Sequence, residues 1–414
     1  MIRADGVVVQ DSILGNSGHP VCAFRVASQL LLGRAATSDI LSPAMQLLKH
    51  NVPTPALVVN LDHLESNLTA LQKAVSAARK QLRPHAKAHK CLEIAQRQIH
   101  AGAIGVCVAT LAEMELMTSA GIGVLLTTPV ASSLKTERIA GWIHDGAHIR
   151  VVVDHPGQVR LFQDAAEKAG VRIPVLVDLD VGDHRTGIPC DERAVALALE
   201  VASSANLRFA GLQAYSVSGS HTEGWEVRRT HSLAAIAQAI PIQRDLLKRG
   251  LDAKTLTGGS TGTWDIDLAI PELTELQAGS YALMDVAYRK IGGVPFAPAM
   301  TILATVVSAS HDTFVTVDAG YKAFATDRPF GPEAVGLNDV KWQWAGDEHG
   351  ILHFEKGSRT LQPGDRVEFL APHCDPTVNL YDRIFACRGD RVEAVWPLKR
   401  ATLEAAPVLV DIAC

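Results

Sequence analysis

The regular alternation of strand-like and helix-like segments between residues 54 and 284 constrains the fold more than any other feature of the chain. Short apolar runs rich in β-branched residues recur there, and segments with helical apolar spacing separate most of them. The predicted strands are Pro84–Ala88, Gly105–Ala109, Val124–Thr128, Ile149–Asp154, Pro174–Asp180, Phe209–Tyr215, Thr255–Gly259 and Glu275–Met284. The predicted helices are Leu92–His100, Leu111–Ala120, Lys135–His144, Gln158–Ala169, Ala194–Ser203 and Ser232–Arg249. Strands that are apolar on both faces are typical of a parallel sheet covered by helices, so the pattern predicts an α/β domain.

Eight strand-and-helix repeats favour a (β/α)8 TIM-like barrel over an open doubly wound sheet. The spacing of the segments does not show whether the sheet closes on itself, so the open sheet stays as the alternative. In a barrel the reacting groups lie at the carboxyl ends of the strands and in the loops that follow them. The alternation therefore predicts where the functional residues lie as well as the fold class.

The pattern changes after Met284, where strands separated by turn residues replace the alternation. The predicted strands are Thr301–Ser310, Thr313–Asp318, Gly350–Lys356, Asp365–Leu370, Ile384–Arg388 and Arg391–Trp396. We expect a partly packed or irregular N-terminal extension over 1–45, a barrel over 46–288 and an all-β domain over 289–414. The early strand at 56–60 fits either of the last two.

Composition and charge argue against several classes of protein. The chain has 414 residues and a net charge of −5 at pH 7, and no dense run of Lys and Arg indicates a nucleic-acid partner. No apolar stretch is long enough to cross a bilayer, so we expect no membrane partner. The seven cysteines are scattered without a Cys-x-x-Cys pair, which argues against a disulfide framework and favours a reducing cytoplasm.

A lysine between two histidines marks the first predicted barrel strand. The segment reads Arg83-Pro84-His85-Ala86-Lys87-Ala88-His89-Lys90. Alternate side chains of an extended strand share a face, so we expect His85, Lys87 and His89 to project together. Neighbouring positive charge and burial lower the pKa of an amine, and Schiff-base chemistry with an aldehyde cofactor requires a neutral lysine. The alternative interpretation is a basic surface strand.

Small and hydroxylated residues follow the seventh predicted strand. The loop reads Gly258-Gly259-Ser260-Thr261-Gly262-Thr263. Its backbone N–H groups can approach a phosphate closely, and the hydroxyls of Ser260 and Thr261 add donors. Phosphate sites in barrels favour the loops after strands seven and eight. The loop therefore predicts a phosphate site, with a flexible turn as the alternative.

His373 and Asp375 form a candidate metal site in the β domain. They lie two residues apart, so both side chains can face one direction while Cys374 points away. Two protein ligands leave the other positions to water or substrate, which suits a catalytic site. Imidazole plus carboxylate fits Mn²⁺ or Zn²⁺, with Mg²⁺ as a further option. The alternative is an exposed loop that binds no metal.

Several short motifs of this chain occur together, in the same order, in a known family. They are Pro84-His85-Ala86-Lys87-Ala88-His89-Lys90, Arg185-Thr186-Gly187, Gln213-Ala214-Tyr215, Gly258-Gly259-Ser260-Thr261-Gly262, Gln277-Ala278-Gly279-Ser280-Tyr281 and His373-Cys374-Asp375-Pro376-Thr377. On these motifs the chain resembles the family of D-threonine aldolase, 3-hydroxy-D-aspartate aldolase and D-serine dehydratase. That family belongs to the alanine-racemase-like, fold-type III pyridoxal phosphate (PLP) enzymes. The resemblance runs from about Thr54 to Arg400.

The resemblance implies how this chain would hold PLP. Lys87 forms the Schiff base, and Arg185 faces the pyridine nitrogen. Because arginine does not readily give up its proton, that nitrogen would stay neutral. His85 and Tyr215 match residues beside the ring. The phosphate is assigned to Gly259, Ser260, Thr261, Gly279, Ser280 and Tyr281.

The resemblance also implies a lyase that acts on D-configured β-hydroxy amino acids. His373 and Asp375 hold the divalent metal, most simply Mn²⁺, and His221 lies near the substrate hydroxyl as general base. A retro-aldol cleavage then yields glycine and an aldehyde. The alternative is dehydration of D-serine or D-threo-3-hydroxyaspartate to an oxoacid and ammonia. Dehydratases of the family tend to carry cysteine two positions after the histidine, so Asp375 favours the aldolase.

Other interpretations stay open at this point. An amino-acid racemase would use the same cofactor without a metal, and a non-catalytic PLP carrier would lack the β domain. A metal-only hydrolase on an open sheet is the remaining alternative. Relatives often pack the β domain of one subunit near the barrel of another, so a homodimer is expected. The substrate side chain stays open, because the sequence identifies no extra cation that an acidic group on Cβ would need.

Overall fold

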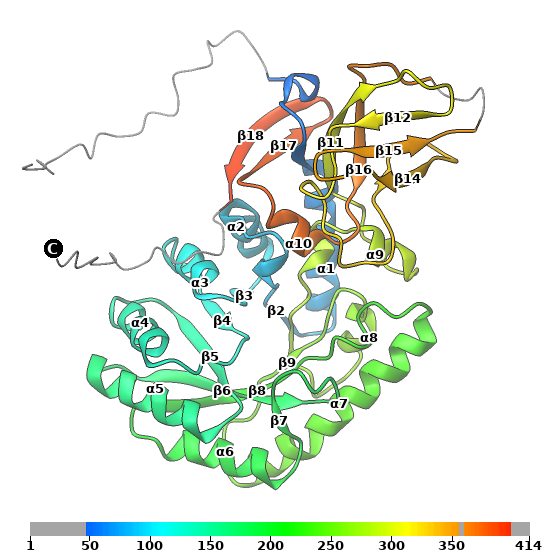
Figure 1. The fold of residues 1–414 in the computed structure, drawn as a ribbon. Coiled ribbons are helices and arrows are strands. Elements are labelled where there is room, and N and C mark those ends of the chain that lie inside the picture. Colours follow the sequence, from blue (N-terminus) through cyan, green and yellow to red (C-terminus); the bar gives the residue numbers. More distant parts are fainter. Residues whose placement is uncertain (1–46, 356–359, 399–414) are drawn as a thin grey trace, which may run out of the picture. The chain divides into compact units, whose positions relative to one another are not determined.

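Two nine-stranded sheets dominate the residues that the computed structural model describes, 47–355 and 360–398 (Figure 1). The first sheet is parallel, with strand order β2-β10-β9-β8-β6-β5-β4-β3 and the short β7 beside β6. Its strands are β2 (Gln81–Leu82), β3 (Val106–Val108), β4 (Val124–Leu126), β5 (Ile149–Val153), β6 (Ile173–Asp180), β7 (Ile188–Pro189), β8 (Leu207–Ala214), β9 (Leu256–Gly258) and β10 (Glu275–Leu276).

The two ends of this sheet meet. An isolated parallel bridge joins His85, which follows β2, to Cys107 in β3. The N–H of Cys107 donates to the carbonyl of Pro84 at 2.9 Å. The N–H of Ile104 donates to the carbonyl of Leu82, also at 2.9 Å. The parallel strands thereby close into a ring, which confirms the predicted (β/α)8 barrel and argues against the open sheet.

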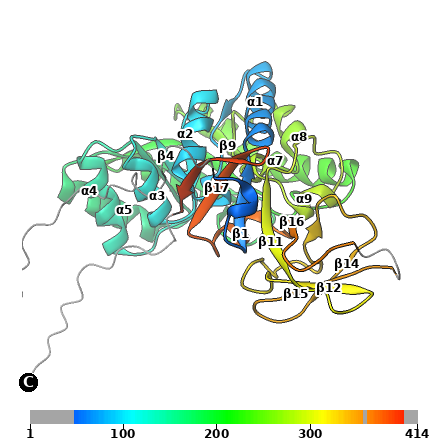
Figure 2. The same cartoon turned by 90° about the horizontal axis from the view of Figure 1, so that it is seen from above.

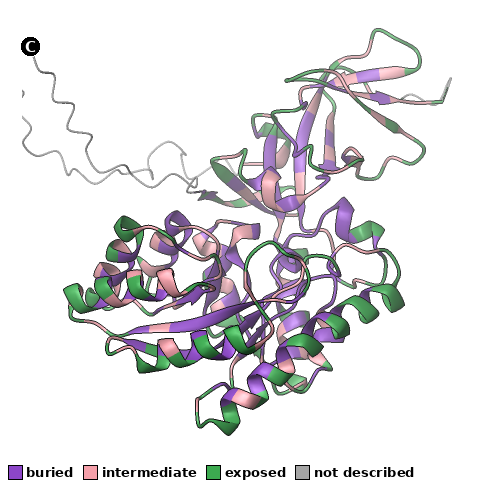
Figure 3. Cartoon of the chain, turned by 60° about the horizontal axis from the view of Figure 1, so that its bottom comes forward, coloured by how far each residue is buried: buried purple, intermediate pink, exposed green. Residues whose placement is uncertain are grey.

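Helices surround the barrel. Five of them begin and end within two residues of the predicted segments, whereas the helix predicted from Ser232 begins at Trp225. The surrounding helices are α1 (Leu61–Ala77), α2 (Leu92–Ala101), α3 (Leu111–Thr118), α4 (Ser133–His144), α5 (Pro156–Ala169), α6 (Glu192–Ser203), α7 (Trp225–Lys248) and α8 (Trp264–Leu268). Side-chain caps fix several helix starts, as where Thr110 accepts from the N–H of Glu113 at 3.3 Å. Figure 3 shows the barrel strands buried and the outer faces of the helices exposed.

The second sheet contains the early strand as well as the C-terminal strands (Figure 2). Its members are β1 (Ala56–Asn60), β11 (Met300–Ser308), β12 (Phe314–Val317), β13 (Glu333–Ala334), β14 (Lys341–Trp344), β15 (Gly350–His353), β16 (Arg366–Leu370), β17 (Arg383–Arg388) and β18 (Arg391–Pro397). β1 pairs antiparallel with β11 and parallel with β17. The rings of Phe324, Trp342 and Phe369 meet edge to face inside this domain.

Short helices replace three segments that the sequence predicts as extended. Pro84–Ala88 contains the 3₁₀ turn η2 (Ala86–Ala88), where the ring of His85 accepts from the N–H of Lys87 and so caps the turn. Glu275–Met284 is a strand only over β10 and then forms η3 (Ser280–Ala282). The His373 segment begins α10 (Cys374–Val378). In each case a local turn or cap competes with the extended backbone that alternation predicts.

Three further points complete the fold. The helix α9 (Val286–Lys290) and the turn η1 (Lys49–Asn51) add to the described elements. The predicted N-terminal extension over 1–45 lies outside the described residues. Within the described residues, no helix is long and apolar enough to cross a membrane.

Candidate functional site

The candidate site lies where the barrel meets α10. Lys87 reaches a cavity of about 250 Å³ that is also lined by His85, Thr127, Arg185, Tyr215 and Gln277. These residues follow different barrel strands, and their convergence at the carboxyl ends of the strands is the arrangement expected for a barrel enzyme. α10 packs on η2 from the second domain, so both domains contribute to the site.

Lys87 forms an ion pair with Asp375 across this contact. The Lys87 side chain is 39% exposed and that of Asp375 is 13% exposed. Burial lowers the pKa of the Lys87 amine, but Asp375 and Tyr215 raise it, and the net pKa lies above the ordinary value. Burial raises the pKa of Asp375, but Lys87 lowers it well below the usual range. The predicted lowering of the lysine pKa by its two histidine neighbours is therefore wrong for this structure.

His89 does not share a face with Lys87, contrary to the sequence prediction. Its ring is fully buried, accepts from the N–H of Cys91 at 3.1 Å and contacts the Gln98 side-chain oxygen at 3.2 Å. Since one ring nitrogen accepts, the other donates to Gln98. The 3₁₀ turn breaks the alternation between Lys87 and His89, which removes His89 from the cavity.

His85 does line the cavity with Lys87. Its Nδ1 accepts from the N–H of Lys87 at 3.4 Å, and its Nε2 lies 3.0 Å from the hydroxyl of Thr127. Burial and the charge of Lys87 lower the pKa of His85 well below its usual value, so its ring is neutral. A neutral, fixed imidazole can pack beside a planar cofactor ring without adding charge to it.

A tight turn after β6 presents Arg185. The N–H of Gly187 donates to the carboxylate of Asp154 at 2.9 Å. Gly187 has a φ of 102°, in the left-handed region, and a Cβ there would lie within 2.5 Å of the Leu179 backbone. The guanidinium of Arg185 lies 5.4 Å from the centre of the Tyr215 ring. Arginine and tyrosine thus form one wall of the cavity.

The carboxylate of Asp267 holds the glycine-rich loop that follows β9 through hydrogen bonds. Its carboxylate accepts from the N–H of Ser260 at 3.1 Å and from the hydroxyl of Thr263 at 2.5 Å. The hydroxyl of Ser260 lies 2.8 Å from that of Thr263. The N–H and the hydroxyl of Ser260 therefore both have hydrogen-bond partners already. In the described part of the chain, no hydrogen bond occupies the N–H of Thr261 or Gly262.

The second predicted phosphate segment, 279–281, connects the loop with both domains. The hydroxyl of Thr261 accepts from the N–H of Tyr281 at 3.0 Å. Ser280 donates to Asp375 at 3.1 Å, whereas the Tyr281 hydroxyl lies 3.3 Å from Gln98 and away from the cavity. A Cβ at Gly279 would lie 2.6 Å from the His85 carbonyl, so the chain must be glycine there. The free N–H groups of this loop, together with the lysine and the aromatic wall of the cavity, are groups that suit a phosphate-bearing aldehyde such as PLP.

His373 and Asp375 lie at the start of α10, which Asp285 anchors by accepting from the N–H of Cys374 at 2.8 Å. Nδ1 of His373 lies 2.7 Å from Asp327. That contact leaves Nε2 of His373 free to bind a metal. In the described ranges, no group of three or more His, Cys, Asp or Glu side chains is placed to hold a metal ion. The donor chemistry fits a two-ligand divalent site, although Asp375 is paired here with Lys87.

His221 reaches the same site from the loop before α7. Its ring centre lies 5.9 Å from that of His373 and 4.5 Å from that of Tyr288. Nε2 of His221 lies 3.3 Å from the guanidinium of Arg328. Burial, Arg328 and His373 lower the pKa of His221 to about 4. A neutral imidazole is the form that can accept a proton.

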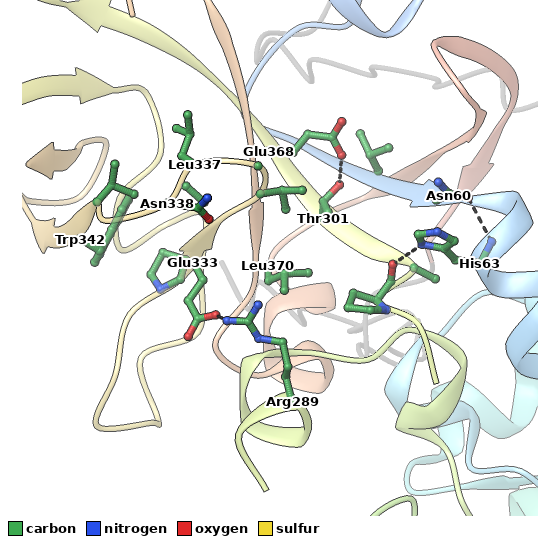
Figure 4. Close-up of a pocket in the computed structure, with 18 of the residues that line it drawn as sticks. Asn60, His63, Arg289, Thr301, Glu333, Leu337, Asn338, Trp342, Glu368 and Leu370 are labelled. Carbon is green, nitrogen blue, oxygen red and sulfur yellow. Dashed lines mark hydrogen bonds and ion pairs between the residues drawn. The ribbon is translucent and has the colours of Figure 1, made fainter. Parts of the chain in front are cut away.

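A second cavity, of about 1010 Å³, lies in the C-terminal domain and not at Lys87 (Figure 4). Asn60, His63, Arg289, Glu333 and Glu368 line it. Arg289 pairs with Glu333 there. Several of its titratable groups are already engaged: His63 contacts the Pro298 carbonyl at 2.7 Å, and Glu368 pairs with Lys49 and accepts from the hydroxyl of Thr301.

Sequence reasoning missed several residues of the site. Asp327, Arg328 and Tyr288 come from segments for which the sequence predicts no function, and Thr127 ends a strand without a motif. An Asp-Arg-Pro turn such as Asp327-Arg328-Pro329 is an ordinary loop sequence. Only the packing of this loop against α10 shows that Asp327 and Arg328 belong to the site, and no sequence signal identifies them.

Comparisons with known proteins match both domains of the chain. Residues 59–284 match the family "Alanine racemase, N-terminal domain", and residues 299–387 match the "Putative serine dehydratase domain". The chain is 36% identical to the D-threonine aldolase of Arthrobacter sp over 352 residues, covering 84% of this chain and 92% of that protein. It is 33% identical to the 3-hydroxy-D-aspartate aldolase of Paracoccus denitrificans (strain Pd 1222) over 357 residues, again covering 84% and 92%.

A solved structure is similar in fold as well as sequence. The D-threonine aldolase from Filomicrobium marinum is 35% identical, with a TM-score of 0.82, over 86% of this chain and 98% of that chain. Dehydratase relatives are more distant. The similarity spans both domains, and Lys87 and Asp375 both lie within the matched ranges.

Proposed function

This chain belongs to the alanine-racemase-like family of D-threonine aldolase and 3-hydroxy-D-aspartate aldolase, and on that premise we propose that it is a PLP- and divalent-metal-dependent lyase. Its substrate is a D-configured β-hydroxy amino acid, cleaved between Cα and Cβ to glycine and an aldehyde. The observation that carries the proposal is the meeting of Lys87 with Asp375, His373 and His221 at one cavity edge.

The residues around Lys87 are suited to hold PLP in one orientation. When bound, PLP withdraws electrons from the bonds to Cα. Lys87 would hold the cofactor aldehyde, and Arg185 would donate toward the ring nitrogen and keep a proton off it. His85 and Tyr215 would flank the ring. Gly259, Thr261 and Gly279 would hold the phosphate end, where the free N–H groups of the loop would be the donors.

His373 and Asp375 would hold the metal, with Mn²⁺ as our first choice and Zn²⁺ or Mg²⁺ as alternatives. The metal would lower the pKa of the substrate hydroxyl. Asp327 keeps the His373 ring oriented through Nδ1. For Asp375 to bind the metal it would have to leave Lys87, whose nitrogen would instead be engaged by the cofactor aldehyde.

His221 is the proposed general base. Its neutral ring carries a lone pair on Nε2, the atom that faces Arg328 in the absence of substrate. The proton of the β-hydroxyl moves to this nitrogen as the Cα–Cβ bond breaks, and the hydroxyl oxygen becomes the aldehyde oxygen. The burial that lowers the pKa of His221 to about 4 keeps it in the base form at neutral pH.

Two variants separate the cofactor from the metal. Lys87→Ala should abolish both the visible absorbance of lysine-bound PLP and turnover. His373→Ala should keep the absorbance and lose turnover by roughly a hundredfold or more, because ligands of catalytic metals carry large shares of the rate. Loss of colour in His373→Ala would contradict the assignment of His373 to the metal.

Product analysis tests the reaction itself. The holoenzyme is incubated with D-threonine, 3-hydroxy-D-aspartate and D-serine, with and without Mn²⁺. Glycine plus an aldehyde supports the aldolase, whereas an oxoacid plus ammonia supports the dehydratase. Activity that survives exhaustive chelation would favour a metal-free racemase. We further propose a cytoplasmic homodimer; the five cysteines in the described ranges are all free, as in a reducing compartment.

A further inference from the structure

We propose that Arg328 selects the substituent on Cβ of the substrate, and that the site favours a carboxylate there, as in 3-hydroxy-D-aspartate. The inference rests on the proposed function and adds the substrate class to it. It assigns a specificity role to a residue that lies in the second domain, in the loop between β12 and β13.

The loop that carries Arg328 is fixed to α10. The N–H of Ala325 donates to the hydroxyl of Thr377 at 3.1 Å, and that hydroxyl donates to the carbonyl of His373 at 2.7 Å. Phe324, one residue earlier, is buried in the domain core. The position of Arg328 relative to His373 is therefore set by hydrogen bonds on one side and by packing on the other.

The surroundings of Arg328 place its charge at the Cβ end of the substrate. Nη2 of Arg328 lies 3.3 Å from Nε2 of His221, the proposed base for the β-hydroxyl. The ring of His221 in turn lies 5.9 Å from that of His373, the proposed metal ligand. Within the described residues, no hydrogen bond or ion pair joins Arg328 to Lys87, where the amino group of the substrate would be held. A group attached to Cβ is the part of the substrate nearest Arg328.

The guanidinium of Arg328 has donors left over. Its Nε is buried and has no hydrogen-bond partner among the described residues. In the same part of the chain, its only carboxylate neighbour within 4.0 Å is Asp327, at 3.7 Å from Nε. The same oxygen of Asp327 lies 2.7 Å from His373, so it is already engaged. The side chain is only 23% exposed, which leaves little water to satisfy it.

A substrate carboxylate satisfies these donors. Arginine presents a planar fork that pairs with carboxylates through two hydrogen bonds, and such charge-assisted bonds are among the stronger ones in proteins. The methyl group of D-threonine offers no acceptor and leaves Nε of Arg328 without a hydrogen-bond partner. Sites with desolvated donors reject substrates that lack the acceptor. We expect a preference of roughly ten- to a hundredfold in kcat/KM, the range that one charged hydrogen bond supplies.

The test measures kcat/KM of the PLP- and Mn²⁺-loaded enzyme on 3-hydroxy-D-aspartate and D-threonine. Arg328→Gln should lose roughly ten- to a hundredfold more kcat/KM on the acidic substrate than on D-threonine, mainly through KM, and any loss common to both substrates would report on the contact with His221. Arg328→Lys should recover part of the loss, because it keeps the charge but not the fork. Arg383→Gln is the matched control, since Arg383 is an exposed arginine that pairs with the neighbouring Asp382.

Equal losses on both substrates would overturn the proposal, because they would assign Arg328 to the α-carboxylate or to folding. An unchanged Arg328→Gln enzyme, or a wild-type preference for D-threonine, would overturn it as well. A binding measurement keeps the test independent of lyase activity. D-Aspartate and D-alanine are titrated against the absorbance of bound PLP, and Arg328→Gln should weaken D-aspartate alone. If neither β-hydroxy amino acid yields glycine, the proposed function fails. The ratio of D-aspartate affinity to D-alanine affinity, compared between wild type and Arg328→Gln, would still test the role of Arg328.

Discussion

His89 shows how one side chain near Lys87 can serve stability instead of chemistry. It accepts from the N–H of Cys91 and donates to Gln98, and the amide of Gln98 lies 3.3 Å from the hydroxyl of Tyr281. Burial lowers the pKa of His89 from 6.5 to about 4. The buried chain of hydrogen bonds thus depends on a neutral imidazole, because a protonated ring would have no acceptor for Cys91.

The pKa of His89 predicts a loss of stability in acid. The folded-state pKa is below the unfolded value, so the unfolded state binds the proton more tightly. The contribution of His89 is complete above pH 6.5 and is lost as the pH falls toward 4, by about 3 kcal/mol. Urea unfolding across this window should show a smaller acid loss in His89→Gln than in wild type. The exposed His144→Gln is the control, and an unchanged acid loss in His89→Gln would contradict the prediction.

At the scale of elements, the turn between β6 and β7 determines where Arg185 lies. Gly187 allows this turn because its backbone has a positive φ and approaches Leu179 too closely for a side chain. The contact with Asp154 then fixes the turn to the end of β5. The backbone conformation of this turn therefore determines the position of the Arg185 guanidinium.

Substitution of Gly187 tests the role of this turn. Gly187→Ala should displace Arg185, weaken PLP binding by roughly tenfold or more and cost about 1–3 kcal/mol of folding free energy. Gly182→Ala is the matched control, because Gly182 has a similar φ of 112° but its Cβ would meet only the Gln238 side chain, at 3.7 Å. Absorbance titration with PLP and urea unfolding measure the two effects. Equal losses of PLP affinity and stability in both variants would show that the positive φ is responsible, and not the close approach of residue 187 to the Leu179 backbone.

Sequence patterns predicted elements well and contacts poorly. Hydrophobic periodicity located the barrel strands and helices, because burial on two faces leaves a clear pattern. The same reasoning was wrong for Pro84–Ala88, where a ring nitrogen of His85 caps a 3₁₀ turn. It placed Lys87 and Asp375 in separate motifs, and only the folded chain shows them paired. Arg328 was missed because its role depends on a loop whose sequence is ordinary.

At the scale of the whole described chain, the two domains are joined by a strand that precedes the barrel in sequence but lies in the second sheet, and by contacts between their elements. We propose their boundary near 288–289, yet β1 lies in the second sheet although the barrel follows it in sequence. η2 of the barrel packs on α10, and Lys87 pairs with Asp375 across that contact. Neither domain can therefore unfold without removing partners from the other.

This shared structure predicts one cooperative unfolding transition. Far-ultraviolet circular dichroism reports mainly on the barrel helices, whereas tryptophan fluorescence reports on both domains. Three of the six tryptophans, Trp342, Trp344 and Trp396, lie in the second domain, and the other three lie in barrel helices, so early unfolding of the second domain would give a separate first step in fluorescence. Urea unfolding followed by dichroism and by tryptophan fluorescence should give coincident curves. A fluorescence transition at lower urea than the dichroism transition would show that the second domain unfolds independently. Arg383→Gln serves as a surface control that should leave both curves coincident.

The position of β1 also affects how the protein is made. Its neighbour β11 begins about 240 residues further along the chain, and β17 follows later still. At bacterial and eukaryotic synthesis rates of about 5–20 residues per second, the strand waits about 12–48 s on the ribosome before its first partner is translated. Its apolar residues, Leu57, Val58 and Val59, are buried only after that partner arrives. The nascent chain therefore depends on α1, the barrel surface or a chaperone to shield this strand until synthesis is nearly complete.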